Sequence, residues 1–554
     1  LLALGTVSGG AVQAEELELS GGTSGIQGEE ELLTTDSETP DGTNTTTPDG
    51  TTTPDGTTTT TPDGTTTPDG TITTTPDGTT TTTPDSTTTP DGTSTMTPGG
   101  DNPDGTTVIG GTTVTDGTTV TDGTTPTDGN PGTNGIALLA GTSDAGSVEI
   151  NDENFDPGVK QWIINNKYDK DNNNVLSEGE RNNGTNFSPD NPNVLSELKS
   201  LKGLEYFTKL TTVDLSKAKD GVPTLTNVDD VLNLPNLTTL NISKTGVTGE
   251  LDVSNLTSLT TLNVSGTGVT GLTGLSNLTT LNISGTGVTG ELDVSNLTSL
   301  MTLNVSGTGV TGLTGLSNLT VLTTLNISST GVTGELDVSN LTSLMTLNVS
   351  GTGITGLTGL SNLTNLRSLL IYNTGLSGEL DVSDLPALSE ITGYGTKITG
   401  ITFGSKNTNI SSVRMGNTRS LTSLSGLEHL TNANGVTLKI QGCSVSSINI
   451  PAGSANFTEI DCSNGDLNNN TTLESVVIGE GVKVETLNLT KATAVTSVSF
   501  GENATVGTLN LTNATAVASI SFPTTAMNMT TLNLSGATAL TELKNLNNQL
   551  TTLE

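Results

Sequence analysis

The side chains best suited to chemistry lie in one short acidic segment, residues 169–180. It reads DKDNNNVLSEGE, so oxygen-bearing side chains recur at alternate positions. Calcium is a hard cation that takes roughly six to eight oxygen ligands, and a 12-residue loop supplies them from positions 1, 3, 5, 7, 9 and 12. The predicted ligands are the side chains of Asp169, Asp171, Asn173, Ser177 and Glu180 and the main-chain carbonyl of Val175.

This spacing matches the calcium loop of an EF-hand. Position 6 holds Asn174 in place of the usual glycine, and asparagine tolerates the left-handed backbone needed there at some energetic cost. One such loop is visible, and Asn182-Asn183-Gly184 ends the following helix early. We expect a structural calcium ion, because no open site or substrate handle accompanies the loop. The alternative that the sequence leaves open is a solvated acidic turn that caps a helix.

A small globular segment, residues 146–209, must position this loop. It holds half of the twelve aromatic residues of the chain. Phe155, Val159, Trp162 and Ile163 recur at the spacing of an amphipathic helix. We expect this segment to be an N-terminal cap on the elements that follow.

Leucines set the period of the chain from residue 210 onward. The motif LxxLxL begins at Leu237, Leu259, Leu278, Leu300, Leu322, Leu344, Leu366 and Leu388, and Ile410 adds one more step. All but one of these steps span 22 residues, and the exception spans 19. A fixed period in the twenties is typical of leucine-rich repeats, whose coils stack into a solenoid. We expect such repeats over residues 210–472 and a continuation with 11-residue half-repeats over residues 473–554.

Threonine occupies the position at which such repeats usually carry asparagine. These residues are Thr245, Thr267, Thr286, Thr308, Thr330, Thr352, Thr374 and Thr396. We expect each hydroxyl to bond the backbone of the neighbouring coil, with fewer hydrogen bonds than an amide would make.

The repeats and the cap together resemble a known family. The block LSNLTVLTTLNI, residues 316–327, resembles the internalin-type repeats of Gram-positive surface proteins. The acidic loop that leads into LKGLEYF, residues 201–207, is similar to the cap of bacterial leucine-rich-repeat surface proteins. The resemblance covers residues 146–554. It implies a leucine-rich-repeat β-solenoid, mostly strand and loop, with a small helical EF-hand-like cap, and a secreted or wall-bound role in adhesion and recognition.

The open surface of the solenoid is where a ligand would bind. Alternate strand residues face opposite sides, so the residues two, four and six after the first leucine face the concave surface. Over residues 237–349 the fourth is always asparagine and the sixth always serine, a uniformity that favours repeat duplication over a shaped pocket.

The uniform pattern breaks after Leu366. Tyrosine takes the sixth position in two successive coils, and charged residues lie near it. The predicted ligand-binding residues are Leu370, Tyr372, Glu390, Tyr394 and Arg414. Exposed aromatic rings beside an arginine and a carboxylate suit a protein hot spot or a sugar platform. The alternative is that the two tyrosines pair across strands only for stability.

Composition excludes several classes of function. The chain has 57 acidic and 19 basic residues, a net charge of −38, so we expect no nucleic-acid partner. One histidine, no recognisable nucleophile constellation and no phosphate loop indicate that it is not an enzyme. The sequence contains no run of 18 apolar residues, so we expect no transmembrane segment. Cys443 and Cys462 both point inward, and the sequence leaves open whether they are free thiols or a disulfide.

The two ends of the chain carry their own expectations. Residues 1–14 read as the end of a signal peptide, with Val12 and Ala14 at the −3 and −1 positions of a cleavage site. Residues 15–145 repeat TTTPDG and TTVTDG, which predicts a disordered Thr/Pro/Asp/Gly-rich linker. The last residues stop in mid-pattern, so we expect any cell-wall attachment to lie in a C-terminal region beyond Glu554.

Two functions remain open from sequence. The first is a secreted or cell-surface protein that recognises a host protein or polysaccharide through its concave face. The second is a structural spacer or extracellular-matrix component without a discrete ligand site.

Overall fold

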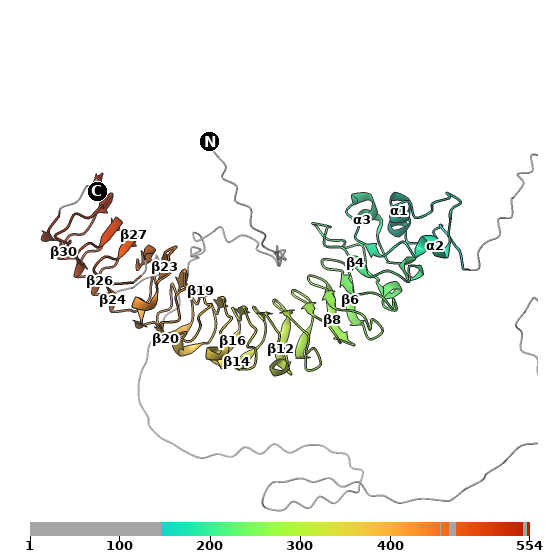
Figure 1. Cartoon of the computed structure of the whole chain (residues 1–554), viewed down its shortest axis with the longest axis horizontal. Helices are drawn as coiled ribbons and strands as arrows, with labels where there is room; N and C mark the ends of the chain where they lie inside the picture. Colours follow the sequence, from blue (N-terminus) through green and yellow to red (C-terminus); the bar gives the residue numbers. More distant parts are fainter. Residues whose placement is uncertain (1–145, 455, 465–471, 547–550, 554) are drawn as a thin grey trace, which may run out of the picture. The chain divides into compact units, whose positions relative to one another are not determined.

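A computed structural model describes residues 146–454, 456–464, 472–546 and 551–553. All of these belong to one compact unit (Figure 1). The predicted signal-peptide remnant and linker, residues 1–145, lie outside the described residues. Within the described part, no helix is both long and apolar enough to cross a bilayer.

The cap is a small helical unit built around one aromatic cluster. Its elements are β1 (Val148–Glu149), α1 (Pro157–Asn165), β2 (Val175–Leu176), α2 (Glu178–Arg181), β3 (Asn186–Phe187), α3 (Pro192–Glu197) and the 3-10 helix η1 (Leu204–Tyr206). Helix α1 starts at Pro157, whose fixed φ suits the first turn. The ring centroid of Trp162 lies 4.7 Å from that of Tyr168, 5.0 Å from that of Phe187 and 5.3 Å from that of Phe207. These rings form the aromatic start of a hydrophobic core that continues into the solenoid.

A single parallel sheet of 17 strands runs from the cap to the end of the described chain, along the inner side of the solenoid in Figure 1. It begins with β3 and ends with β33, each of which has one neighbour, so the ladder is open. After β3 the strands are, in order, β4 (Thr212–Asp214), β5 (Thr239–Asn241), β7 (Thr261–Asn263), β9 (Thr280–Asn282), β11 (Thr302–Asn304), β13 (Thr324–Asn326), β15 (Thr346–Asn348), β17 (Ser368–Leu370), β19 (Glu390–Thr392), β21 (Ser412–Arg414), β23 (Val436–Lys439), β25 (Phe457–Asp461), β27 (Lys483–Asn488), β29 (Thr505–Asn510), β31 (Thr531–Asn533) and β33 (Thr552–Leu553).

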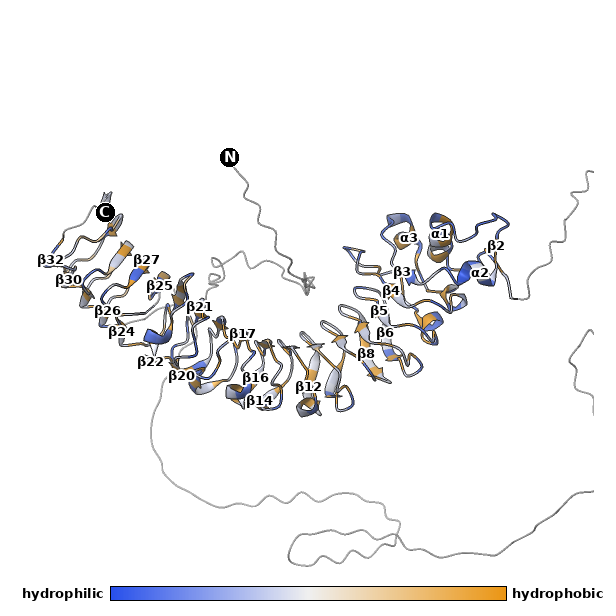
Figure 2. Ribbon diagram, in the orientation of Figure 1, coloured by the Kyte–Doolittle hydropathy of each residue, from blue (hydrophilic) through white to orange (hydrophobic). Residues whose placement is uncertain are grey.

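The register of this front sheet follows the leucine period. Leu240 pairs with Leu262, and the central leucines stay opposite one another in every step as far as Leu369. Their side chains are buried, and the hydrophobic residues recur coil after coil in Figure 2. The predicted leucine-rich-repeat β-solenoid is therefore confirmed.

The back of the solenoid is built differently along its length. Its first strands pair only two by two: β6 (Thr248–Asp252) with β8 (Gly268–Thr273), β10 (Thr289–Asp293) with β12 (Gly309–Thr314), and β14 (Thr333–Asp337) with β16 (Gly353–Thr358). Three strands then join, β18 (Ser377–Asp381), β20 (Lys397–Thr402) and β22 (Ser423–Ser425). The last sheet holds β24 (Ser447–Ile450), β26 (Ser475–Ile478), β28 (Ser497–Phe500), β30 (Ser519–Ser521) and β32 (Glu542–Lys544). From β5 to β33 front and back strands alternate along the described chain, on both sides of residue 473.

Two of the early interruptions in back-strand pairing coincide with a 3-10 turn. The 3-10 helices η3 (Leu316–Asn318) and η4 (Leu360–Asn362) follow β12 and β16, where the back-strand pairing is interrupted.

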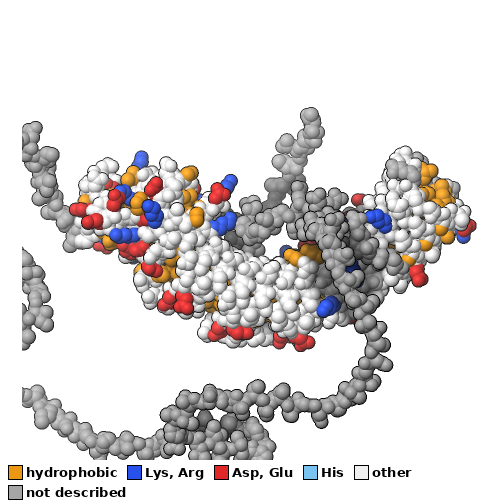
Figure 3. All heavy atoms as spheres, turned by 180° about the vertical axis from the view of Figure 1, so that it is seen from behind, with side chains coloured by type: hydrophobic (Ala, Val, Ile, Leu, Met, Phe, Trp, Pro, Cys, Tyr) orange, Lys and Arg blue, Asp and Glu red, His pale blue; other side chains and the backbone are white. Residues whose placement is uncertain are grey.

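The first strand of each pair contains the sequence TGELD, and its glutamate and aspartate side chains are exposed. Figure 3 shows acidic side chains gathered in clusters along this outer edge. Two further 3-10 helices are η2 (Asp229–Val231) and η5 (Leu427–His429).

The threonine ladder differs from the expectation. Each of the eight hydroxyls donates to a carbonyl of its own coil, three residues earlier, at 2.6–2.9 Å. The prediction of a bond to the neighbouring coil is wrong for these residues, because the short side chain reaches its own turn first. Thr418, one coil later, does bond the preceding coil, with its hydroxyl 3.1 Å from the Gly393 carbonyl.

The two cysteines are buried free thiols. The Cys443 thiol donates to the Met415 carbonyl at 3.1 Å. Burial raises the pKa of Cys443 to about 12 and also raises the pKa of Cys462. Both side chains therefore belong to the packed interior as neutral groups.

Candidate functional site

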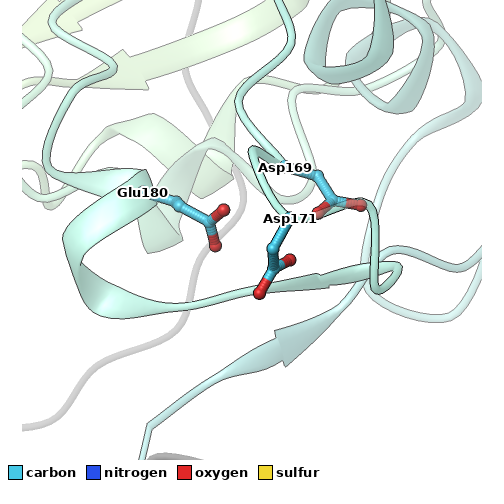
Figure 4. A group of neighbouring side chains, drawn as sticks. All are labelled: Asp169, Asp171 and Glu180. Atoms are coloured by element: carbon cyan, nitrogen blue, oxygen red, sulfur yellow. The ribbon is translucent and has the colours of Figure 1, made fainter.

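The acidic loop of the cap brings its carboxylates together. Carboxylate oxygens of Asp169, Asp171 and Glu180 lie within 4.8 Å of one another. Figure 4 shows the first two on the loop and the third on the helix that leaves it. Three carboxylates at this separation repel one another, and a divalent cation between them removes that repulsion.

Local hydrogen bonds hold the loop in the shape that such a site needs. The amide of Asn174 donates to Asp169 Oδ2 at 2.9 Å, and the amide of Val175 donates to Asn173 Oδ1 at 2.7 Å. Asn174 adopts φ 60°, the left-handed conformation expected of position 6. Asn172 does the same with φ 57°, which the sequence reasoning did not anticipate.

Glu180 closes the loop from its far end. Its Oε1 accepts a hydrogen bond from the Lys170 amide at 2.7 Å, and its Oε2 accepts one from the Ser177 amide at 2.9 Å. Ser177 in turn caps helix α2 in a reciprocal capping box with Glu180. Burial alone would raise the pKa of Glu180, but these hydrogen bonds outweigh it and hold the pKa below its ordinary value.

Strand β1 braces the loop. It pairs antiparallel with β2, placing Val148 opposite Leu176 and Glu149 opposite Val175. Leu176 is buried in the cap core. The acidic loop is thus held in place by pairing with strand β1 and not with a second loop of its kind. Its donor set of carboxylate, amide, hydroxyl and carbonyl oxygens fits a hard cation.

The lowered pKa of Glu180 predicts an acid-sensitive cap. Near its ordinary pKa of 4.5, Glu180 binds fewer protons in the folded cap than in the unfolded chain. Its stabilising contribution is therefore complete above that pKa and is lost as the pH falls through the lower folded-state value. Without calcium, the midpoint temperature of unfolding reported by Trp162 fluorescence should decrease as the pH is lowered below about 4.5. The decrease should be less steep in Glu180→Gln. Glu178→Gln is the matched control. If it made the midpoint temperature equally less dependent on pH, the acid sensitivity could not be assigned to Glu180.

The concave surface brings the two predicted tyrosines into contact. The rings of Tyr372 and Tyr394 stack with centroids 4.6 Å apart and planes 13° apart. Both side chains are half-buried. Burial, and secondarily the neighbouring Tyr372, raises the pKa of Tyr394.

The other predicted residues lie on the strands beside this pair. Leu370, Thr392 and Arg414 are register partners on β17, β19 and β21. Glu390 is half-buried two residues before Thr392, whereas Arg414 is exposed. The Arg414 Nε donates to Ser412 Oγ at 3.1 Å, and among the described residues its guanidinium has no carboxylate partner. We call Leu370, Tyr372, Glu390, Tyr394 and Arg414 the tyrosine patch.

Charges one step farther along are already paired. Lys439 Nζ lies 3.1 Å from Glu459 Oε2. Asp461 is buried and accepts a hydrogen bond from the Ser463 amide at 3.0 Å. These groups delimit the tyrosine patch on that side.

The uniform part of the concave surface has a structural explanation. In six successive coils the fourth-position asparagine accepts, through Oδ1, the amide of the serine two residues later. Each asparagine therefore closes the turn at the end of its strand. This local role explains the repeat of Asn and Ser without a ligand.

Comparisons with known proteins find similarity among solved structures. No protein-family model matches the chain, and no curated protein sequence does. Among solved structures, the functional domain of InlJ from Listeria monocytogenes is 23% identical, with a TM-score of 0.39, covering 66% of this chain and 73% of that one. The internalin inlF of the same organism is 20% identical, with a TM-score of 0.38, covering 71% and 96%. The plant peptide hormone receptor RGFR1 in complex with RGF2 is 17% identical, with a TM-score of 0.36, covering 66% and 77%.

Proposed function

We propose that this chain is a secreted or cell-surface recognition protein that binds a protein ligand through the tyrosine patch. The observation that carries the proposal is a break in a surface whose polar side chains otherwise bond their own turns. At this break two stacked rings lie beside Arg414, which has no carboxylate partner within the part of the chain that the structure describes. Aromatic and arginine side chains are the residues that most often dominate protein interfaces.

The stacking geometry favours a protein over a polysaccharide. A sugar platform needs an aromatic face that is open to the ligand. Here each ring covers one face of the other, because the planes are nearly parallel at 4.6 Å. Ring edges and hydroxyls suit the mixed apolar and hydrogen-bonding contacts of a protein interface. Arg414 would add a charged hydrogen bond to a carboxylate of the ligand.

Binding assays with matched variants test this proposal. The full chain would be screened, with calcium, against immobilised matrix proteins, mucins and polysaccharides. Tyr372→Ala/Tyr394→Ala should weaken binding to a protein on the array by at least about 30-fold, since hot-spot side chains contribute about 2 kcal/mol or more. Ser306→Ala/Ser328→Ala alters the same position in two uniform coils and should bind as the wild type does.

The outcomes separate recognition from a spacer. Loss of binding with an unchanged melting temperature supports the recognition function. Binding that survives the tyrosine double variant would overturn the assignment of the site. A lower melting temperature, without any wild-type binding, would instead favour cross-strand packing and the spacer function.

We propose further that the cap holds a structural calcium ion. Asp169, Asp171, Asn173, Ser177 and Glu180 would contribute side-chain oxygens, and Val175 its carbonyl. The support is the convergence of three carboxylates together with the left-handed backbone at Asn174. The ion would fix the loop against β1 and the cap core, and would stabilise the cap as any ligand of the folded state does.

The single tryptophan of the chain lies in the cap, so its fluorescence reports on the cap alone. At free calcium roughly 100 times the Kd, the cap should gain about 2.7 kcal/mol. Glu180→Gln should remove most of this gain, whereas Glu178→Gln, on the same helix but outside the ligand set, should keep it. A calcium-independent wild-type unfolding curve would refute the proposal.

A further inference from the structure

A groove of about 910 Å³ lies on the cap, between helix α1 and the calcium loop. Ile150 and Ile164 supply apolar surface, and Lys160, Lys167 and Lys170 line it as well. Ile164 is 56% exposed although it lies on the helix that carries the buried core residues Trp162 and Ile163. The apolar surface of this groove therefore faces solvent.

The charges of the groove set it apart from the rest of the molecule. The chain has 19 basic residues among 554, and three of them meet here. Lys160 forms an ion pair with Asp152. Lys167 and Lys170 are exposed and, within the described part of the chain, form no ion pair. Asp169 is the one acidic residue among those that line the groove, so lysines outnumber carboxylates beside the exposed isoleucine, in a protein whose net charge is −38.

We infer that this groove binds an acidic peptide segment with aliphatic side chains. Carboxylates of the peptide would pair with Lys167 and Lys170, and its aliphatic side chains would cover Ile164 and the lysine stems. The concave peptide-sized space and the mixture of apolar floor and cationic edge favour this occupant. The inference is independent of the tyrosine patch, which lies on β17–β21.

A labelled octapeptide of alternating glutamate and leucine is the probe, with glutamine–leucine and lysine–leucine octapeptides as controls. The full chain in calcium-containing buffer should bind the acidic peptide, and the binding should weaken as salt is raised. Lys167→Glu/Lys170→Glu should weaken it at least tenfold, and Ile164→Ser should weaken it too. Neither change removes a buried side chain, so Trp162 fluorescence should show a folded cap in both.

Lys217→Glu/Lys219→Glu is the matched control, because it makes the same charge change at two exposed positions outside the groove. It should bind the acidic peptide as the wild type does. Equal weakening in this control would attribute the effect to net charge and overturn the inference. So would equal binding of the glutamine peptide, absence of binding at millimolar peptide, or binding of phosphatidylserine vesicles in place of the peptide.

Discussion

Replacing Asn407 by leucine should destabilise the solenoid by about 2–4 kcal/mol, although the preceding coils carry leucine at that position. The asparagine is 0% exposed. Its Oδ1 accepts the Gly404 amide at 2.8 Å, and its Nδ2 donates to the carbonyls of Val382 and Leu385 at 2.9 and 3.0 Å. The side chain thus joins its own turn to the previous coil. Leucine would leave the partly buried Gly404 amide without its acceptor and would break both bonds to the previous coil.

Thermal and chemical unfolding followed by far-ultraviolet circular dichroism would measure this effect. Asn409→Ala is the matched control. Asn409 also donates to the preceding coil, to the Pro386 carbonyl at 2.7 Å, but it is exposed, so its loss should cost about 0.5 kcal/mol or less. A leucine variant as stable as the wild type would show that hydrophobic packing at this position compensates for the lost hydrogen bonds.

Replacing Asp156 by alanine should destabilise the cap by about 3 kcal/mol. The carboxylate is 5% exposed and caps helix α1 through the Gly158 amide at 2.9 Å. Its other oxygen accepts the amides of Lys199 and Ser200 at 3.2 and 3.0 Å. One side chain therefore ties the start of α1 to the segment that follows α3. Removing it leaves buried amide groups without an acceptor.

Trp162 fluorescence during unfolding would measure the loss in Asp156→Ala. Asn191→Ala tests the specificity of the effect, since Asn191 caps α3 through one hydrogen bond, to the Asn193 amide at 2.9 Å. An ordinary cap contributes about 1 kcal/mol, so the control should lose about a third as much. Equal losses in the two variants would mean that the bonds to Lys199 and Ser200 add nothing.

Periodicity made most of the fold predictable. Because the leucine spacing repeats, the sequence already indicates which side chains point inward and which strands stand in register. Thr245 shows the limit of that reasoning: its burial follows from the repeat, but its hydrogen-bond partner depends on which carbonyl lies nearer. Asn407 carries a visible signal, an asparagine where the preceding coils have leucine. Its role still depends on atoms of a coil that lies about 22 residues away in sequence.

The candidate sites also combine features that the sequence predicts with features that it does not. The ligand spacing of the acidic loop and the left-handed Asn174 follow from residue types at fixed positions. The adjacency of Tyr372 and Tyr394 follows from the strand register. The orientation of their rings does not, because side-chain torsions depend on packing against neighbouring coils. The groove beside Ile164 likewise combines α1 with Ile150 and the acidic loop, which no local pattern brings together.

The pairing of the back strands has a consequence for how the gene can change. From β6 to β16 each back strand pairs with one other strand, so no strand pairing crosses a boundary between two pairs, although backbone hydrogen bonds from Gly287 to the Val269 carbonyl and from Gly331 to the Val310 carbonyl do. Loss or gain of a whole pair, such as the 44 residues from Leu322 through Asn365, joins surfaces that already match. A change of a single coil would leave one strand without its partner. Recombination between near-identical pairs should therefore yield alleles that differ by two coils at a time, with the cap and the tyrosine patch preserved and only their separation altered.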